Sequence, residues 1–153
     1  MNAATAPHTG LRHVDNDSEV AACFALMRQL RPHLASADEL VARWRRQAAT
    51  GYRLLVLWDH GKPVALAGWR LQENLVRGVH AYVDDLVTDA DARSSGHGQQ
   101  VMDRLKLEAR QAGCRSLVLD TPLANVLGHR FYYRNGLLAG ALHFHFPLED
   151  NHR

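Results

Sequence analysis

The sequence predicts a mixed α/β (α+β) fold in a single domain, with a central mixed β-sheet flanked by about four helices. Three observations lead to this prediction. The chain has 153 residues, which is the length of one domain. Its first third has helical periodicity, and its middle third has runs typical of strands. Helical and strand patterns then alternate to the end, giving the order helix, helix, three strands, helix, strand, helix, strand.

The N-terminal part predicts a leader, a short strand and a first helix. Residues 1–10 are small and polar, so we expect a disordered leader there and the domain over 11–150. Residues 11–14 are compatible with a short strand. Apolar residues at helical spacing predict a helix over 18–30, and a proline follows two residues later.

A capping box and a change of periodicity mark the next elements. Ser36 can accept from the amide of Glu39 while that carboxylate reaches back, which predicts a second helix ending before Gly51. Three strand-like runs separated by polar turns follow, at 52–58, 63–71 and 79–88.

The last third begins with an irregular loop over 88–98, which opens an amphipathic helix ending near Gly113. The remaining segments are a strand, a short helix and a long or bent strand, at 116–121, 127–134 and 136–148.

The composition excludes several classes of protein. A formal net charge of +2 is too balanced for a dedicated nucleic-acid binder. No apolar run approaches the ~20 residues that span a bilayer, and the first residues do not resemble a signal peptide. Cys23 and Cys114 are isolated, which favours a reducing, cytoplasmic setting. His143 and His145 have no third ligand in the pattern, so we expect no metal site.

The segment with the clearest chemistry is a glycine-containing loop between a strand and a helix. Gly96 and Gly98 allow backbone conformations or close approaches that a side chain forbids. Helix-opening amides bind anions, most often phosphate, and Arg93 can add a charged contact. The dinucleotide-binding fingerprint fails because position 101 is Val rather than Gly, and the P-loop pattern fails because the loop has no Lys.

This loop resembles the acetyl-CoA loop of the GNAT N-acetyltransferase superfamily. Arg93-x-x-Gly96-x-Gly98 is similar to its Arg/Gln-x-x-Gly-x-Gly/Ala signature, and Leu86-Val-Thr88 is similar to the preceding strand end. A second stretch is similar to the family's Asn-x-x-Ala…Leu-Tyr-x-x-x-Gly-Phe pattern, through Asn125, Gly128, Phe131, Tyr132, Gly136 and Leu137. Gly128 replaces the usual Ala and Leu137 the usual Phe. The order of elements matches over roughly residues 11–148.

The resemblance implies that acetyl-CoA is the cosubstrate. Its diphosphate would lie on the loop amides, and its pantetheine arm would pair with the strand end at 86–88. A splay between this strand and the one at 116–121 would leave room for the arm. The implied cofactor-binding residues are Leu86, Val87, Thr88, Arg93, Ser94, Ser95, Gly96, His97, Gly98, Gln99, Asn125 and Tyr132.

The resemblance also implies two catalytic residues. Tyr132 falls on the position of the family's general acid, which protonates the departing thiolate, and adjacent Tyr133 is the rival. Asp84 and Asp85 resemble the acidic pair of polyamine-type members, where the first acid is the base and the second contacts the amine.

The pair of aspartates also defines an expected acceptor site. Successive strand residues point to opposite faces, so we expect Asp84 and Asp85 to diverge in a regular strand. A buried carboxylate is costly unless it is paired, so both should face a cleft or a partner, and a β-bulge would exchange their roles. His80 and Tyr82 share the face of Asp84 in a regular strand and are candidate substrate-binding residues.

The expected function is therefore transfer of an acetyl group from acetyl-CoA to a primary amine, polyamine-like or otherwise cationic. The alternative is a non-catalytic acyl-CoA sensor of the same fold. We expect no nucleic-acid or membrane partner. The apolar residues of 141–148 would suit strand-edge pairing in a homodimer.

Overall fold

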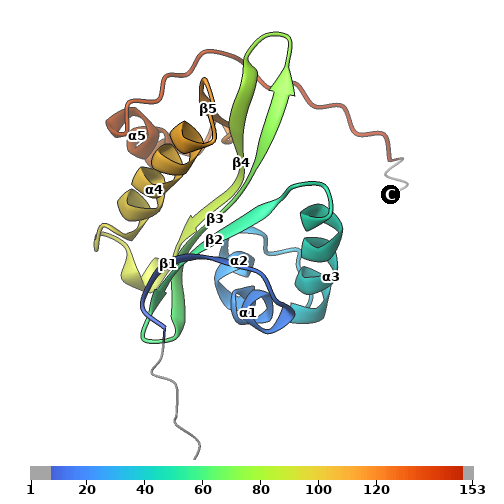
Figure 1. The fold of residues 1–153 in the computed structure, drawn as a ribbon, viewed down its shortest axis with the longest axis vertical. Coiled ribbons are helices and arrows are strands. Elements are labelled where there is room, and N and C mark those ends of the chain that lie inside the picture. Colours follow the sequence, from blue (N-terminus) through green and yellow to red (C-terminus); the bar gives the residue numbers. More distant parts are fainter. Residues whose placement is uncertain (1–7, 150–153) are drawn as a thin grey trace, which may run out of the picture. The chain divides into compact units, whose positions relative to one another are not determined.

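The computed structural model describes residues 8–149, and the chain divides into two compact units, residues 1–119 and 120–153. The first unit contains a five-stranded sheet in the order β1-β2-β3-β4-β5 (Figure 1). Neighbouring strands are antiparallel except β4 and β5, which are parallel. The predicted mixed sheet is thereby confirmed. Its strands are β1 (Gly10–Val14), β2 (Arg53–Asp59), β3 (Lys62–Asn74), β4 (Gly78–Thr88) and β5 (Leu117–Leu119).

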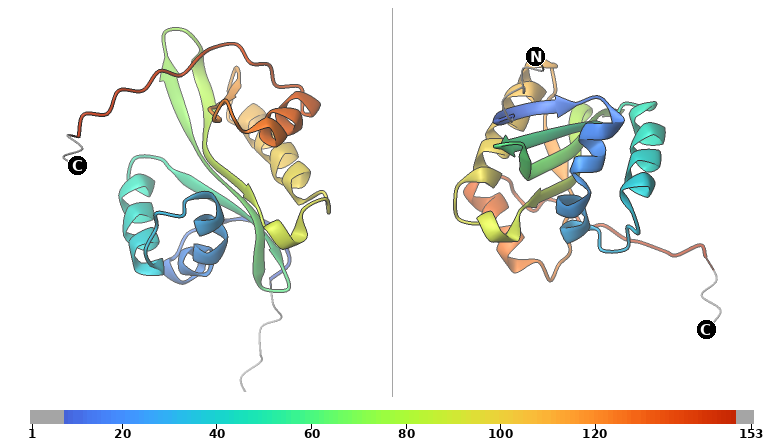
Figure 2. Two further views of the ribbon diagram at one scale, coloured as in Figure 1. Left: turned by 180° about the vertical axis from the view of Figure 1, so that it is seen from behind. Right: turned by 90° about the horizontal axis from the view of Figure 1, so that it is seen from below.

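Helices cover both faces of this sheet. Three of them, α1 (Asp17–Ala22), α2 (Phe24–Leu30) and α3 (Ala37–Ala48), lie on one side, and α4 (His97–Gln111) lies on the other (Figure 1). Figure 2 shows the same layers from below. Among the described residues, every helix is too short or too polar to span a bilayer.

The helix expected over 18–30 is interrupted at Cys23. The Cys23 N–H donates to the carbonyl of Val20 over 3.0 Å, a tighter turn than the α-helical one, and α2 starts at the next residue. The N-cap of α3 is confirmed, because the Glu39 N–H donates to Ser36 Oγ over 3.1 Å. The Glu39 carboxylate reaches back as expected, but it accepts from the N–H of Ala35, the residue before the N-cap, over 2.7 Å.

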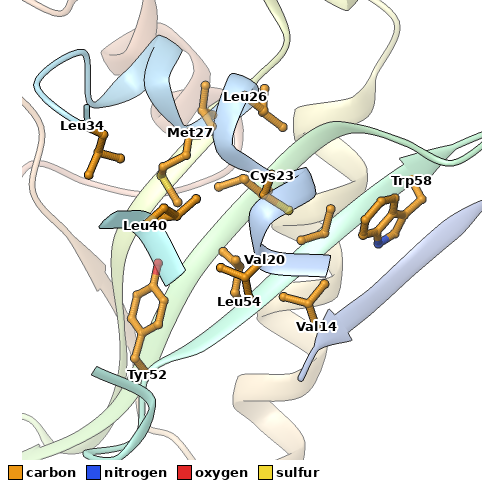
Figure 3. Packing of buried hydrophobic residues seen from close by; sticks show 13 residues of the cluster. Val14, Val20, Cys23, Leu26, Met27, Leu34, Leu40, Tyr52, Leu54 and Trp58 are labelled. Carbon is orange, nitrogen blue, oxygen red and sulfur yellow. The ribbon is translucent and has the colours of Figure 1, made fainter. Parts of the chain in front are cut away.

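The sheet separates two apolar cores. On the α1–α3 side, Leu54, Val56 and Leu66 pack with Val20 and Met27. Figure 3 shows this core, with the Tyr52 ring at its lower end and the phenol oxygen directed toward Leu40. On the α4 side, residues of β2, β3 and β4 pack against Val101, Leu105 and Ala109. The alternation of strand residues between the two cores produces the continuous apolar runs of β2 and β3.

Residues 8–10, which the sequence assigns to the leader, already contact the sheet. Residues 1–7 lie outside the described residues, whereas Gly10 is already the first residue of β1. The carbonyl of His8 accepts from the Gly61 N–H over 2.7 Å, and Thr9 Oγ1 accepts from the His60 N–H over 3.2 Å. These two residues are therefore attached to the β2–β3 turn.

The second unit contains α5 (Val126–Arg134), close to the helix expected over 127–134. The long strand expected over 136–148 was wrong: the described part of this segment after α5 contains no strand. A strand needs a hydrogen-bonded ladder, and no described strand pairs with these residues. Their alternating apolar side chains are exposed instead, with Phe144 at 87% and Phe146 at 81%.

Candidate functional site

The expected phosphate-binding loop opens α4. The chain leaves β4 at Thr88, makes a single 3-10 turn at η1 (Ala90–Ala92), and reaches the helix through Gly96. Gly96 has φ +76° as the N-cap of α4, and no side chain caps the helix there. The first-turn amides therefore have no carbonyl partner within the helix, and an anion can accept from them. A Cβ at Gly96 would meet nothing within 4 Å, so the loop has open space beside this residue.

Beyond its pairing with β5, the backbone of β4 is free to bind an extended ligand along one edge. These two strands pair only through Ala81, Tyr82 and Val83 on β4. Residues 86–88 continue to pair with β3, but no described strand pairs with them on the other side. Unpaired backbone groups at a strand edge can bind an extended chain, as an added strand does. The structure therefore has the expected splay.

A β-bulge brings the two aspartates to one pocket. Gly68 of β3 is paired with Asp85, whereas the next residue, Trp69, is paired with Val83. Asp84 is the extra residue, so the alternation of side chains is broken at this point. The opposite faces expected for a regular strand are not observed, because the bulge lets Asp84 and Asp85 both line a pocket of about 320 Å³ between α2, α3 and the sheet.

Asp85 is fixed by two donors. Its Oδ2 accepts from the Tyr52 hydroxyl over 2.7 Å, and its Oδ1 accepts from Arg31 Nε over 3.0 Å. Burial is the main cause that raises the pKa of Tyr52 well above its usual value, and the neighbouring Asp85 carboxylate acts in the same direction. Tyr52 is therefore a neutral donor that holds the carboxylate in place.

The carboxylate of Asp84 has fewer hydrogen-bond donors than that of Asp85. Its Oδ2 accepts from Arg70 Nε over 2.9 Å, and its main-chain carbonyl accepts from Arg31 Nη2 over 2.8 Å. No described residue hydrogen-bonds Oδ1 of Asp84. The side chain is 29% exposed, compared with 15% for Asp85. Asp84 thus has an accessible carboxylate oxygen in the pocket.

Four residues of this arrangement were missed by the sequence analysis: Arg31, Tyr52, Gly68 and Arg70. Each meets the aspartates through tertiary structure, from positions 14 to 54 residues away for the three side chains that bind them. Gly68 carried a signal, since a glycine inside a strand pattern indicates a bulge or a close approach.

The two other expected acceptor residues lie elsewhere on β4. His80 is buried, and its Nδ1 lies 2.9 Å from the carbonyl of Gly78. Tyr82 is half-buried and pairs with Arg70 of β3 and with Val118 of β5. Neither side chain lines the pocket of Asp84 and Asp85.

In the second unit, Asn125 caps α5. Its Oδ1 accepts from the Gly128 N–H over 3.2 Å, and its Nδ2 donates to Thr121 Oγ1 over 3.0 Å. A Cβ at position 128 would overlap the Asn125 side chain in its present orientation.

Tyr132 and Tyr133 differ in their surroundings on α5. Tyr132 packs edge-on against Phe131, and burial raises the pKa of its phenol. Tyr133 is 57% exposed. The environment of Tyr132 therefore keeps its proton on the oxygen to higher pH than in water.

The chain is similar in sequence to known acetyltransferases. The sequence profile of the Acetyltransferase (GNAT) family matches residues 19–137. An uncharacterized N-acetyltransferase of Bacillus subtilis is 29% identical over 122 residues, which cover 80% of this chain and 86% of the relative. Glucosamine 6-phosphate N-acetyltransferase 1 of Oryza sativa subsp. japonica is 32% identical over 102 residues, 62% of each chain.

A solved structure extends the likeness to the fold. An aminoglycoside N-acetyltransferase in complex with CoA superposes with a TM-score of 0.79 and 16% identity, covering 94% of this chain and 97% of the other.

Proposed function

This chain belongs to the GNAT family of N-acetyltransferases, and on that premise we propose that it transfers the acetyl group of acetyl-CoA to a small-molecule primary amine held beside Asp84 and Asp85. The observation that carries the proposal is the bulge in β4. It directs a partly free carboxylate into a pocket, two residues before the strand edge that would hold the cosubstrate.

In this proposal the acetyl-CoA site consists of the features already described. The amides from Ser94 to Gln99 and the side chain of Arg93 bind the diphosphate. Leu86, Val87 and Thr88 pair with the pantetheine arm, and an amide near Val87 donates to the thioester carbonyl. Asn125 and Tyr132 complete the set through the family resemblance.

The proposed reaction is a direct attack that needs three proton transfers. Asp84 Oδ1 accepts a proton from the acceptor ammonium, and the free amine attacks the thioester carbonyl. The C–N bond forms, the C–S bond breaks, and the phenol of Tyr132 gives its proton to the departing thiolate. The nitrogen then loses its second proton as the amide forms, and that proton, exchanged through solvent, returns Tyr132 to the phenol. Asp85 keeps lone pairs beyond those used by Tyr52 and Arg31, so it helps bind the ammonium.

The charges around the pocket bear on the acceptor class. Asp84 is paired with Arg70 and Asp85 with Arg31, so the aspartates leave little surplus negative charge for a polycation. This favours an acceptor with one reactive ammonium over a polyamine. The rice relative is named for an amino sugar phosphate and the superposed structure for aminoglycosides, so amino sugars are the first compounds to screen.

We also propose a homodimer formed through residues 141–148. Leu142, Phe144, Phe146 and Leu148 alternate along this segment and are all largely exposed. An extended segment with one apolar face is stabilised when a second strand covers it. A second copy of the chain supplies an identical segment.

The first test is calorimetric titration with acetyl-CoA, with CoA and ATP measured beside it. We expect micromolar binding of acetyl-CoA and CoA but not of ATP. Gly96→Val should abolish this binding, because a side chain at φ +76° distorts the loop. Gly51→Val is the matched control, since Gly51 also has positive φ and open space but lies outside the loop.

A measurement of turnover then distinguishes the enzyme from the non-catalytic acyl-CoA sensor. Acetyl-CoA binding with acetylation of an amine supports the enzyme, whereas binding without turnover of any amine supports the sensor. Absence of acetyl-CoA binding by the unaltered protein would refute both.

A further inference from the structure

The residue that follows β4 is a buried carboxylate outside the expected site. Asp89 is 4% exposed. Its Oδ1 accepts from Gln29 Nε2 over 3.1 Å and from the Asp91 N–H over 3.2 Å, and its Oδ2 lies 3.1 Å from Lys62 Nζ. A buried charge is costly unless it is paired in this way. These contacts, with the Gln29 bond as the largest cause, lower the pKa of Asp89 below its usual value.

Gln29 makes a second bond to the same turn. Its Oε1 accepts from the Ala90 N–H over 2.9 Å, so one side-chain amide binds both the last residue before η1 and the first residue within it. The Asp89 N–H donates to the carbonyl of Val64 in β3 over 2.8 Å. The start of the loop is therefore attached to α2 and to the sheet at once.

The end of α2 also reaches the acceptor pocket. Arg31, two residues after Gln29, binds the carbonyl of Asp84 and the carboxylate of Asp85. Leu26 and Met27 of the same helix are buried in the core and keep it against the sheet. One helix end thus contacts β4 at the pocket and again where the loop begins.

We propose that Gln29 and Asp89 are positioning residues for acetyl-CoA, which fix the start of its diphosphate loop to the helix end that also holds the acceptor pocket. The inference rests on the proposed function, because it requires acetyl-CoA to bind this loop. The three residues of η1 separate Asp89 from Arg93, the first residue of the Arg93–Gly98 motif. A shift at Asp89 therefore moves the amides that would meet the diphosphate.

The test uses two variants and one control. Gln29→Leu keeps the size of the side chain but loses both hydrogen bonds, and Asp89→Asn removes the buried charge. Asp91→Asn removes the same charge from an exposed neighbour in the same turn, so it measures the electrostatic effect on a bound polyphosphate alone. Acetyl-CoA affinity is measured by calorimetry, KM and kcat with an amine found by the screen, and the melting temperature by scanning calorimetry.

We expect Gln29→Leu and Asp89→Asn to raise the Kd and KM for acetyl-CoA about tenfold, the effect of losing one or two hydrogen bonds. We expect kcat at saturating acetyl-CoA to change less than about twofold and Asp91→Asn to retain its affinity.

Two other outcomes would contradict either the positioning role of Gln29 and Asp89 or the proposed function itself. If both variants bind acetyl-CoA as tightly as the unaltered protein, even with a lower melting temperature, Asp89 is only a structural residue and the inference is wrong while the proposed function stands. If the unaltered protein does not bind acetyl-CoA, the proposed function fails and the inference fails with it.

Discussion

The ring of Tyr52 lies directly over the Cα of Gly68, so closely that a methyl group on that glycine would overlap the phenol. Gly68 is also the residue that pairs with Asp85 across the bulge. The absent side chain leaves the space through which the Tyr52 hydroxyl reaches the Asp85 carboxylate. A glycine in β3 and the tyrosine just before β2 thus together determine the position of an acidic residue in β4.

The first prediction concerns this contact. Gly68→Ala should displace Tyr52 from Asp85, lower the free energy of unfolding by about 1–3 kcal/mol because the site becomes overpacked, and raise KM for the amine. Urea denaturation and steady-state kinetics measure the two effects. In a Tyr52→Ala background, Gly68→Ala should leave the free energy of unfolding almost unchanged, because the phenol that the methyl group would overlap is absent. An equal cost in both backgrounds would contradict the assignment of strain to Tyr52.

The second prediction separates the two aspartates. Asp84→Asn removes the carboxylate with the accessible oxygen and should lower kcat on the order of 100-fold or more, the usual worth of a general base. Asp85→Asn should act mainly on KM for the amine and on stability, because Asp85 is bound by Tyr52 and Arg31. Asp59→Asn, at an exposed turn, serves as the control. A larger loss of kcat for Asp85→Asn would reverse the proposed roles.

The bulge also marks where sequence reasoning reaches its limit. The strands, the capping box of α3 and the loop that opens α4 follow from local patterns, and these were predicted. Whether Asp84 or Asp85 is the extra residue depends on the register with Gly68, which is 16 or more positions away in the chain. The partners Arg31 and Tyr52 are likewise set by tertiary packing, which no local pattern encodes.

The strand predicted after α5 was wrong for a different reason. Alternation of apolar and polar residues over 141–148 predicts a strand, but a strand exists only when another strand completes its ladder. The periodicity describes one face of the segment and does not contain the identity of its partner. Phe144 and Phe146 are therefore exposed, in a segment with which no described strand pairs.

The third prediction follows from that exposure. Replacing Phe144 and Phe146 by Ser should convert the proposed dimer into a monomer, because it removes much of the apolar face that a second copy would cover. Light scattering coupled to size exclusion measures the mass. The paired change of His143 and His145 to Ser, on alternate positions, is the matched control and should leave the dimer intact. A monomeric unaltered protein would refute the dimer outright.

The fourth prediction tests the general acid. Tyr132→Phe should lower kcat about 100-fold while the Kd for acetyl-CoA stays within about twofold, since the phenyl ring keeps the packing and only the proton donor is lost. Tyr133→Phe, at the exposed neighbouring position, should leave kcat unchanged. If the losses are exchanged between the two variants, the acid is Tyr133. If neither variant is impaired, the thiolate takes its proton from another source.

The last prediction concerns His13, which lies between Trp69 and Glu108. The Trp69 N–H donates to His13 Nε2 over 3.2 Å, and a Glu108 carboxylate oxygen lies 3.3 Å from the same nitrogen. Burial is the largest cause that lowers the pKa of His13. Glu108 opposes this effect, and Arg53 and Arg104 add to it. The bond from Trp69 acts in the same direction as burial, because it uses the lone pair that a proton would occupy.

The folded protein therefore binds fewer protons at His13 than the unfolded chain does near the ordinary pKa of ~6.5. Stability from this site is complete above that pH and is lost as the pH falls toward the lower, folded pKa. We expect the free energy of unfolding, measured in urea, to fall between about pH 7.5 and about pH 5.5, and to fall less in His13→Gln. His60→Gln, at an exposed turn, should follow the unaltered protein. Parallel curves for His13→Gln and the unaltered protein would show that His13 does not titrate in this way.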